Sequence, residues 1–183
     1  TIVPKRRLAR AADLLVSGVL LIVLLPLLLL VALVALLASG QLLSRTTQVG
    51  RRRVGRQAGP ESFTMVAFQS VRADGTISRL GRWLRGSELD RLPQLWNVLK
   101  GDLALVGVKP LAPSEAADLQ EAWHQKRNEH SAGFTGLWYV QAPADADLDA
   151  VLIADAYYAA TYGARGNLAI LGRTPIVWAR RVA

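Results

Sequence analysis

The sequence predicts a small mixed α/β domain that follows an N-terminal membrane segment. An uncharged apolar run of about 25 residues fills positions 14–38, more than the roughly 20 needed to cross a bilayer as a helix. Residues 63–71 alternate loosely, as in a short strand, and later segments repeat apolar residues at helical spacing. The chain has 183 residues, so we expect residues 1–44 in the membrane and residues 45–183 as one cytoplasmic domain.

Pro26 predicts a break in the apolar run, because a proline inside a helix removes a hydrogen bond and clashes with the preceding turn. Both ends of the run carry basic residues, and positive charge marks the cytoplasmic side of a membrane segment. This pattern favours a re-entrant helix that enters and leaves by one face; a kinked crossing stays open. We expect Asp13 to pair with Arg10 at the interface. The basic flanks are Lys5, Arg6, Arg7 and Arg10, then Arg45, Arg51, Arg52, Arg53 and Arg56.

The composition indicates anionic partners and excludes thiol chemistry. The net charge is +8 and the pI about 10.6, which suits lipid headgroups, nucleotides or nucleic acid. The absence of cysteine rules out disulfides and thiolate zinc sites. His124 and His130 lack a metal-ligand spacing, so they predict no metal centre.

The first half of the domain begins with a basic stretch and a basic helix. Residues 41–59 are polar and glycine-containing, which predicts a linker lying on the headgroups. Residues 78–85 form a predicted helix in which Arg79, Arg82 and Arg85 share one face. That basic stripe suits phosphate binding, with a solvated surface as the alternative.

The second half predicts a strand between amphipathic helices. Residues 114–130 suit a helix with Ser114 as N-cap and with Leu119 and Trp123 buried. We expect a turn at 133–136 and a strand at 137–140. Two further helices are predicted at 148–162 and at 168–182, the second interrupted near Pro175. Its Trp178 and arginines are typical of a membrane interface.

Several of these segments, taken in order, resemble one family. They are RAADLLVS before the proline-broken run, RVG, SRLGRWLR, LDRLPQLWNVLKGDLALVG, GFTGLW and a Tyr-Tyr pair before the last helix. Over nearly the whole chain they resemble the bacterial sugar transferases, the monotopic phosphoglycosyl transferases. The resemblance implies a re-entrant helix and an α/β domain resting on the cytoplasmic face of the bacterial inner membrane.

The resemblance also implies a reaction. Such enzymes move a phospho-sugar from a nucleotide diphosphate sugar to polyprenyl phosphate in polysaccharide or glycan synthesis. An aspartate attacks the diphosphate, nucleoside monophosphate leaves, and the lipid phosphate resolves the covalent intermediate. Both substrates are anionic, so the site needs concentrated positive charge, for which Mg²⁺ is expected in the family together with Arg and Lys.

Asp90 matches the nucleophile of this family, and Arg91 stands where the family has a metal-binding glutamate. A guanidinium offers Mg²⁺ no oxygen ligand, so Mg²⁺ is not expected here. Other family motifs lose cations, and appear as Ala67-Phe68-Gln69, Asp74-Gly75-Thr76, Gly107-Val108-Lys109-Pro110 and Ala142-Pro143. The basic positions that still match, and are expected to bind substrate phosphate, are Arg79, Arg85, Lys109 and Arg127.

Two functional hypotheses follow from this pattern. In the favoured one, the chain is a degenerate family member with weak or no catalysis, acting as a binding subunit or as a homo- or hetero-oligomeric partner of a related transferase. In the alternative, Asp90 is an active nucleophile and Arg91 replaces the metal. A nucleic-acid binder would explain the charge but not LPQLWNVLKGD, so no nucleic acid is expected. Without the resemblance, Asp90 would be a helix N-terminal charge.

Overall fold

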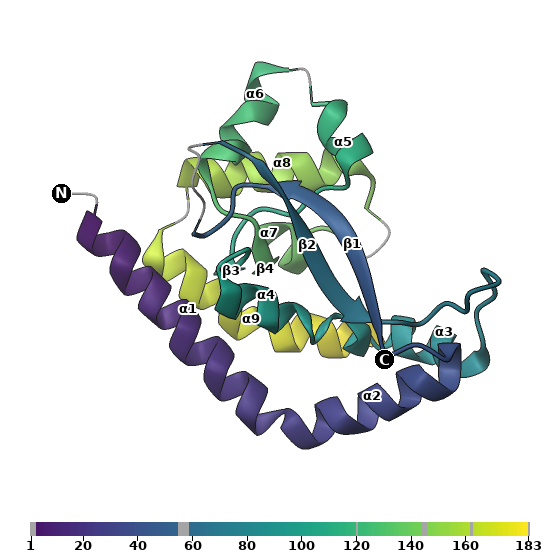
Figure 1. The fold of residues 1–183 in the computed structure, drawn as a ribbon. Coiled ribbons are helices and arrows are strands. Elements are labelled where there is room, and N and C mark those ends of the chain that lie inside the picture. The colour runs from purple at the N-terminus through teal and green to yellow at the C-terminus, as the bar shows by residue number, and fades with distance from the viewer. Residues whose placement is uncertain (1–2, 55–58, 120, 144–145, 162, 183) are drawn as a thin grey trace.

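The computed structural model describes residues 3–54, 59–119, 121–143, 146–161 and 163–182, and it confirms a mixed α/β fold (Figure 1). The basic residue Arg56 lies outside this part of the chain. The elements up to the middle of the chain are α1 (Val3–Val23), α2 (Leu25–Ser39), β1 (Leu43–Gly50), β2 (Glu61–Phe68), α3 (Arg79–Gly86), η1 (Leu89–Arg91) and α4 (Gln94–Lys100). The remaining elements are β3 (Ala104–Val106), α5 (Pro113–Ala117), α6 (Ala122–Gln125), η2 (Lys126–Glu129), β4 (Gly133–Thr135), α7 (Leu137–Val140), α8 (Leu148–Thr161) and α9 (Ala164–Val182).

Helices α1 and α2 form the predicted broken helix. They meet at an angle of 67°, and together Leu8–Val23 and Leu25–Ser39 have the length and apolar composition of a membrane segment; no single helix within the described residues has both. Pro26 lies in the first turn of α2, where its missing N–H costs no helical hydrogen bond. The break therefore comes just before the proline.

Polar contacts fasten α1 to the domain. Asp13, only 7% exposed, forms its ion pair with Arg53 at 2.7 Å and not with Arg10 as predicted. Arg10 instead donates to the carbonyls of Val98 and Leu99, both at 2.6 Å. These carbonyls lie in the last turn of α4, where the negative end of the helix dipole attracts a cation.

Strands β1 and β2 form a long antiparallel hairpin. Strand β1 occupies residues 43–50 of the linker predicted at 41–59, so that part of the prediction is wrong, and residues 55–58 lie outside the described residues. Leu43 pairs with Phe68 at one end and Gly50 with Glu61 at the other. Strand β1 is mostly polar and partly exposed, so it carries little of the alternating pattern by which strands are found in a sequence.

The LPQLWNVLKGD motif builds the support under this hairpin. Asn97 is fully buried; its amide accepts from the Val66 N–H at 3.0 Å and donates to the Thr64 carbonyl at 2.7 Å and to Asp102 at 3.0 Å. One side chain of α4 thus joins β2 to the turn after α4. The motif is chiefly structural, as its apolar residues Leu95 and Val98 also lie in the core.

A short parallel pair, β3 and β4, forms the centre of the domain. Backbones approach closely beside it: a Cβ atom on Gly133 would lie 2.2 Å from the Gly107 nitrogen, and one on Gly136 would lie 2.0 Å from the Gly107 oxygen. Neither position has room for a side chain. The turn predicted at residues 133–136 is wrong, because Gly133–Thr135 form strand β4. The glycines of GFTG are instead required for close packing.

Three further predictions for the second half are corrected. Residues 137–140 form helix α7, because a four-residue apolar run fits helix and strand equally well. The helix predicted over 114–130 is divided into α5, α6 and η2. Its N-cap is Ala112 and not Ser114. Leu119 is buried as predicted, whereas Trp123 is 38% exposed. Helix α9 continues through Pro175.

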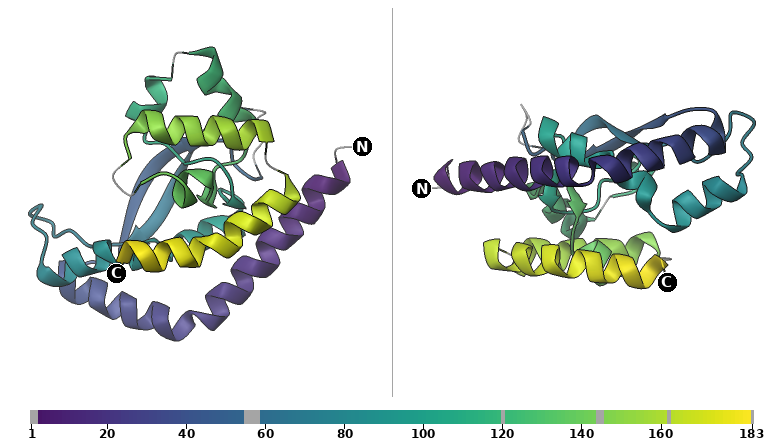
Figure 2. Two further views of the ribbon diagram at one scale, coloured as in Figure 1. Left: turned by 180° about the vertical axis from the view of Figure 1, so that it is seen from behind. Right: turned by 90° about the horizontal axis from the view of Figure 1, so that it is seen from below.

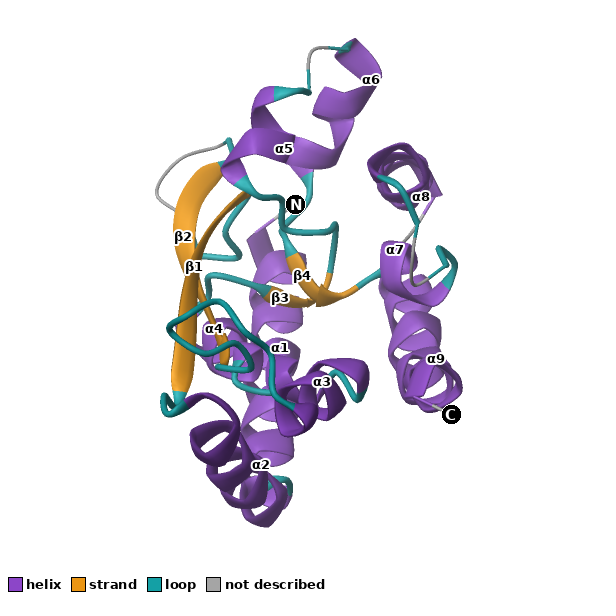
Figure 3. Ribbon diagram, turned by 90° about the vertical axis from the view of Figure 1, so that its right-hand side faces the viewer, coloured by secondary structure: helices purple, strands orange, loops and turns teal. Residues whose placement is uncertain are grey.

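The layers place the long hairpin on one side of β3 and β4, and α7, α8 and α9 on the other (Figure 3). Seen from below, α1 and α2 run along one side of the molecule and α9 along the other (Figure 2). The predicted helices at 78–85 and 148–162 are confirmed as α3 and α8, and Ser78 caps α3 by accepting from the Gly81 N–H at 3.1 Å.

Candidate functional site

Asp90 lies in the 3-10 turn η1, which is preceded by Glu88, a residue with a strained backbone conformation. Glu88 has a φ of 54° and is the one non-glycine residue with positive φ among those described. This left-handed conformation is uncommon outside glycine, Asn and Asp. The turn is therefore held in place by contacts around it.

Partial burial raises the pKa of the Asp90 carboxyl to about 6, against the opposing charges of Arg91 and Arg85. At neutral pH the carboxylate remains mostly ionised, by about ten to one. Asp90 thus has the charge of a nucleophile, and two of the arginines singled out in the sequence lie close enough to act on it.

We expect Asp90→Asn to stabilise the protein in a pH-dependent manner. The folded pKa of about 6 lies above the ordinary carboxyl value of 3.8, so ionisation of Asp90 destabilises the fold progressively as pH rises from about 4 to 7. The Asn variant should gain about 1–2 kcal/mol over the wild type at pH 7, allowing for solvent screening, and almost nothing at pH 4. Thermal unfolding of both proteins across this range measures the difference; a gain independent of pH would contradict the shifted pKa.

Glu88 holds the turn against α7 and α9. Its carboxylate accepts from the Tyr139 hydroxyl at 2.6 Å and pairs with Arg91 at 3.3 Å and with Arg181 at 3.6 Å. Trp178 of α9 also donates to the Ser87 carbonyl at 2.8 Å. The C-terminal helix therefore fixes the backbone just before Asp90.

Arg91 lies among aromatic rings. Its guanidinium is 5.2 Å from the ring centre of Tyr139, 5.5 Å from that of Trp138 and 6.0 Å from that of Phe134. It also donates to the Phe134 carbonyl at 3.3 Å. Cation–π contacts and the Glu88 pair thus hold a permanent positive charge beside Asp90.

The residues of this turn do not fit a Mg²⁺ site. Glu88, the second carboxylate near Asp90, is engaged by two arginines and a tyrosine, and the guanidinium of Arg91 offers Mg²⁺ no oxygen ligand. Within the described residues no group of three or more His, Asp or Glu side chains is arranged to hold a metal ion. The local charge is supplied by guanidinium groups.

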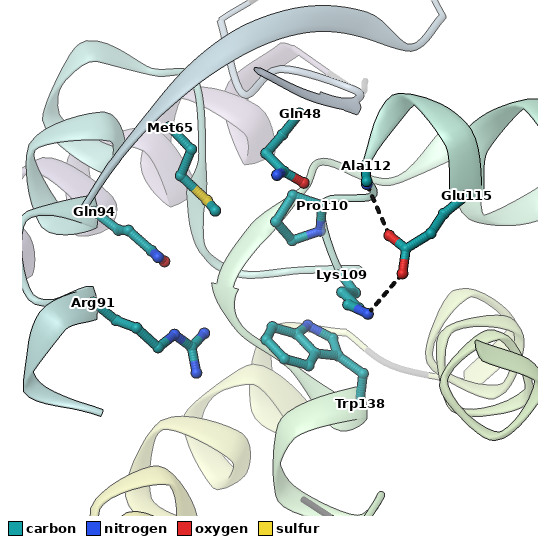
Figure 4. Close-up of a pocket in the computed structure, with 9 residues that line it drawn as sticks. All are labelled: Gln48, Met65, Arg91, Gln94, Lys109, Pro110, Ala112, Glu115 and Trp138. Carbon is teal, nitrogen blue, oxygen red and sulfur yellow. Dashed lines mark hydrogen bonds and ion pairs between the residues drawn. The ribbon is translucent and has the colours of Figure 1, made fainter. Parts of the chain in front are cut away.

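Arg91 faces a pocket of about 300 Å³, in which Lys109 and Glu115 also lie (Figure 4). The Lys109 ammonium is 3.4 Å from Glu115, whose other oxygen accepts from the Ala112 N–H at 2.8 Å. Asp90 is not among the described residues that line the pocket. The full lining is Gln48, Met65, Arg91, Gln94, Lys109, Pro110, Ala112, Glu115 and Trp138.

Arg127 was predicted to bind substrate phosphate, and in the structure its guanidinium is paired inside the domain. Its side chain is 3% exposed and forms a buried ion pair with Asp155 at 2.9 Å. Asp155 also accepts from the Lys109 N–H at 3.1 Å, and Arg127 donates to the Lys109 carbonyl. The pair therefore fixes the backbone of Lys109.

Arg79 and Arg85 lie on the exposed face of α3, as the sequence predicted. Of these two, Arg85 is the one whose charge lowers the pKa of Asp90. The structure places Arg85 and Arg91 near Asp90 and places Arg91 and Lys109 around one pocket. Arg79 lies in the first turn of α3. Sequence reasoning missed Glu88 and Glu115. Neither belongs to a recognisable motif, and each gains its role from a residue that folding brings near.

Comparison with known proteins decides the family. The profile described as "Bacterial sugar transferase" matches residues 4–181. The chain belongs to the bacterial sugar transferase family. Its relatives include the "Undecaprenyl-phosphate galactose phosphotransferase" of Salmonella typhimurium, 36% identical over 61% of this chain and 23% of the relative. The "UDP-galactose-lipid carrier transferase" of Erwinia amylovora is 33% identical over 57% of this chain and 22% of the relative.

A third relative of this family member is the "Undecaprenyl-phosphate glucose phosphotransferase" of Komagataeibacter xylinus, 43% identical over 38% of this chain and 14% of the relative. The matches thus cover less than a quarter of each of these three curated relatives. The family-level role is that of sugar phosphate transfer to a lipid carrier, and the activity of this chain requires its own test.

Proposed function

We propose that this bacterial sugar transferase family protein binds a nucleotide sugar and polyprenyl phosphate at the inner membrane with weak or no turnover. It serves polysaccharide or glycan synthesis as a binding subunit or as the oligomeric partner of an active relative. The observation that carries this proposal is the internal pairing of its cations: Arg91 with Glu88, Lys109 with Glu115 and Arg127 with Asp155. Within the pocket, both cations, Arg91 and Lys109, thus face a carboxylate of the protein itself, which lowers the net positive charge offered to a transferred phosphate.

The membrane position rests on a large exposed apolar surface. A soluble protein rarely exposes a large contiguous apolar patch, whereas here α1 and α2 expose many leucines and valines, α3 exposes Leu80 and Trp83, and α9 exposes Leu168 and Ile176. With the 67° bend, these faces support a re-entrant α1–α2 segment with the domain on the cytoplasmic side. The arginines of α9 suit anionic headgroups.

Binding without turnover is tested on the full chain in lipid nanodiscs containing polyprenyl phosphate. Isothermal titration with a panel of UDP-sugars, repeated in EDTA, should show saturable binding to at least one donor that EDTA does not remove. Absence of binding to every donor would contradict the proposal.

An active transferase is the second candidate, and the state of Asp90 favours it. The carboxylate is ionised at neutral pH and flanked by Arg85 and Arg91, which can stabilise phosphoryl transfer by contact with phosphate oxygens. In this case nucleoside monophosphate release would survive EDTA and disappear in Asp90→Asn.

A further inference from the structure

The two cations of the pocket have internal partners of different strength. Glu88, which pairs with Arg91, is fastened further by Tyr139 and Arg181, and its side chain is 20% exposed. Glu115, which pairs with Lys109, has a side chain that is 32% exposed, and Lys109 is 30% exposed. An exposed pair of this kind is worth only about 0–1 kcal/mol.

Glu115 can leave Lys109 without disturbing its own helix. Its second oxygen accepts from the Ala112 N–H at the start of α5, and this contact does not involve Lys109. The backbone of Lys109 is held independently of Glu115, because Asp155 accepts from its N–H and Arg127 donates to its carbonyl. The point from which the lysine side chain extends is therefore fixed, and its counterion is exchangeable.

The Lys109 ammonium and the Glu115 carboxylate point toward each other at the edge of the pocket that Arg91 enters from the opposite side (Figure 4). A ligand phosphate that reaches Lys109 meets the negative charge of this carboxylate and competes with it for the N–H donors of the ammonium. Phosphate carries more negative charge and more acceptor oxygens than a carboxylate, and charge-assisted contacts to it are strong.

We infer that Glu115 is an exchangeable internal counterion that competes with the phosphate of a ligand for Lys109. This deepens the proposed function, on which it rests, by naming the residue that sets the affinity of the pocket. In the unliganded protein Glu115 neutralises Lys109 and so lowers the affinity of the pocket for phosphate. When a phosphate-bearing ligand binds, the Glu115 carboxylate is displaced from Lys109.

Glu115→Gln tests this inference directly, because glutamine retains the acceptor for the Ala112 N–H and loses the charge. Pyrophosphate is titrated into the full chain in phosphatidylcholine nanodiscs, whose uncharged surface does not compete for the anion. We expect the Kd to fall by about fivefold to tenfold, the size of effect that one like charge has at an interface this exposed.

Two further variants separate the proposed exchange from a general change in charge. Glu121→Gln removes the same charge from the surface beside α6 and should leave the Kd within about twofold. In a Lys109→Gln background, Glu115→Gln should give no gain, since the effect acts through the lysine.

Each outcome decides the matter. A Kd unchanged by Glu115→Gln, or a gain that persists without Lys109 or is matched by Glu121→Gln, would overturn the inference and leave the proposed function standing. Absence of pyrophosphate binding by both wild type and Glu115→Gln would overturn the inference together with the phosphate-binding part of the proposed function.

Discussion

Replacing Arg127 by leucine is expected to destabilise the protein by about 3–5 kcal/mol, because it leaves the fully buried Asp155 without its counterion. Burial already raises the pKa of Asp155 to about 6 even with Arg127 in place. Chemical unfolding of the full chain in nanodiscs, followed by near-ultraviolet circular dichroism, gives the loss in unfolding free energy.

The control for this variant is the double replacement Arg127→Leu with Asp155→Leu. It removes both charges, so it should recover part of the loss. Recovery should be incomplete, since the Lys109 N–H and carbonyl lose their side-chain partners. A loss below about 1 kcal/mol for the single variant would show that the pair is not a structural anchor.

Replacing Arg91 by glutamate is expected to raise nucleoside monophosphate release by at least about 10²-fold and to make it dependent on Mg²⁺. The change places a further carboxylate next to Asp90, in addition to Glu88, and removes the guanidinium. Loss of one contact that stabilises the transition state costs about 10² to 10³ in rate. Restoring a carboxylate ligand for Mg²⁺ at position 91 should therefore give a gain of similar size.

Arg91→Gln is the matched control, because it removes the guanidinium without adding an oxygen ligand of negative charge. It should show no such gain, and Asp90→Asn in the Arg91→Glu background should abolish release. Equal release by the Gln and Glu variants would contradict the view that residue 91 determines the deficit.

Local sequence patterns were sufficient for the parts of the fold in which short-range forces dominate. Residues 78–85 show helical periodicity with a serine cap, and Pro26 lies within two residues of the bend. These features depend on neighbours in the sequence. The same applies to α8, whose apolar residues repeat at helical spacing.

Tertiary contacts decided what the sequence did not show. Strand β1 exists because β2 pairs with it along eight residues, although its own residues are mostly polar. In the sequence Asn97 has no feature that distinguishes it from other helical residues, and its structural role depends on its hydrogen bonds to β2.

In the candidate site, too, the motif identified some residues, whereas the partners of those residues became known only from the fold. The family motif identified Asp90, Arg91 and Lys109 as residues of one region. It also suggested Arg127 as a phosphate ligand, and nothing local to Arg127 reveals a carboxylate 28 positions later in the chain that neutralises it. An ion pair between residues that are distant in the sequence cannot be predicted from a local motif.

The central claim is that this protein binds the substrates of its family with little turnover. Its most direct test is nucleoside monophosphate release from UDP-sugars by the wild-type chain in nanodiscs with polyprenyl phosphate, with and without EDTA, beside an active relative in the same membranes. We predict at most a trace of release from the wild-type chain while the relative turns over. Release at a rate comparable to that of the relative, lost in Asp90→Asn, would contradict the account and establish Asp90 as a working nucleophile.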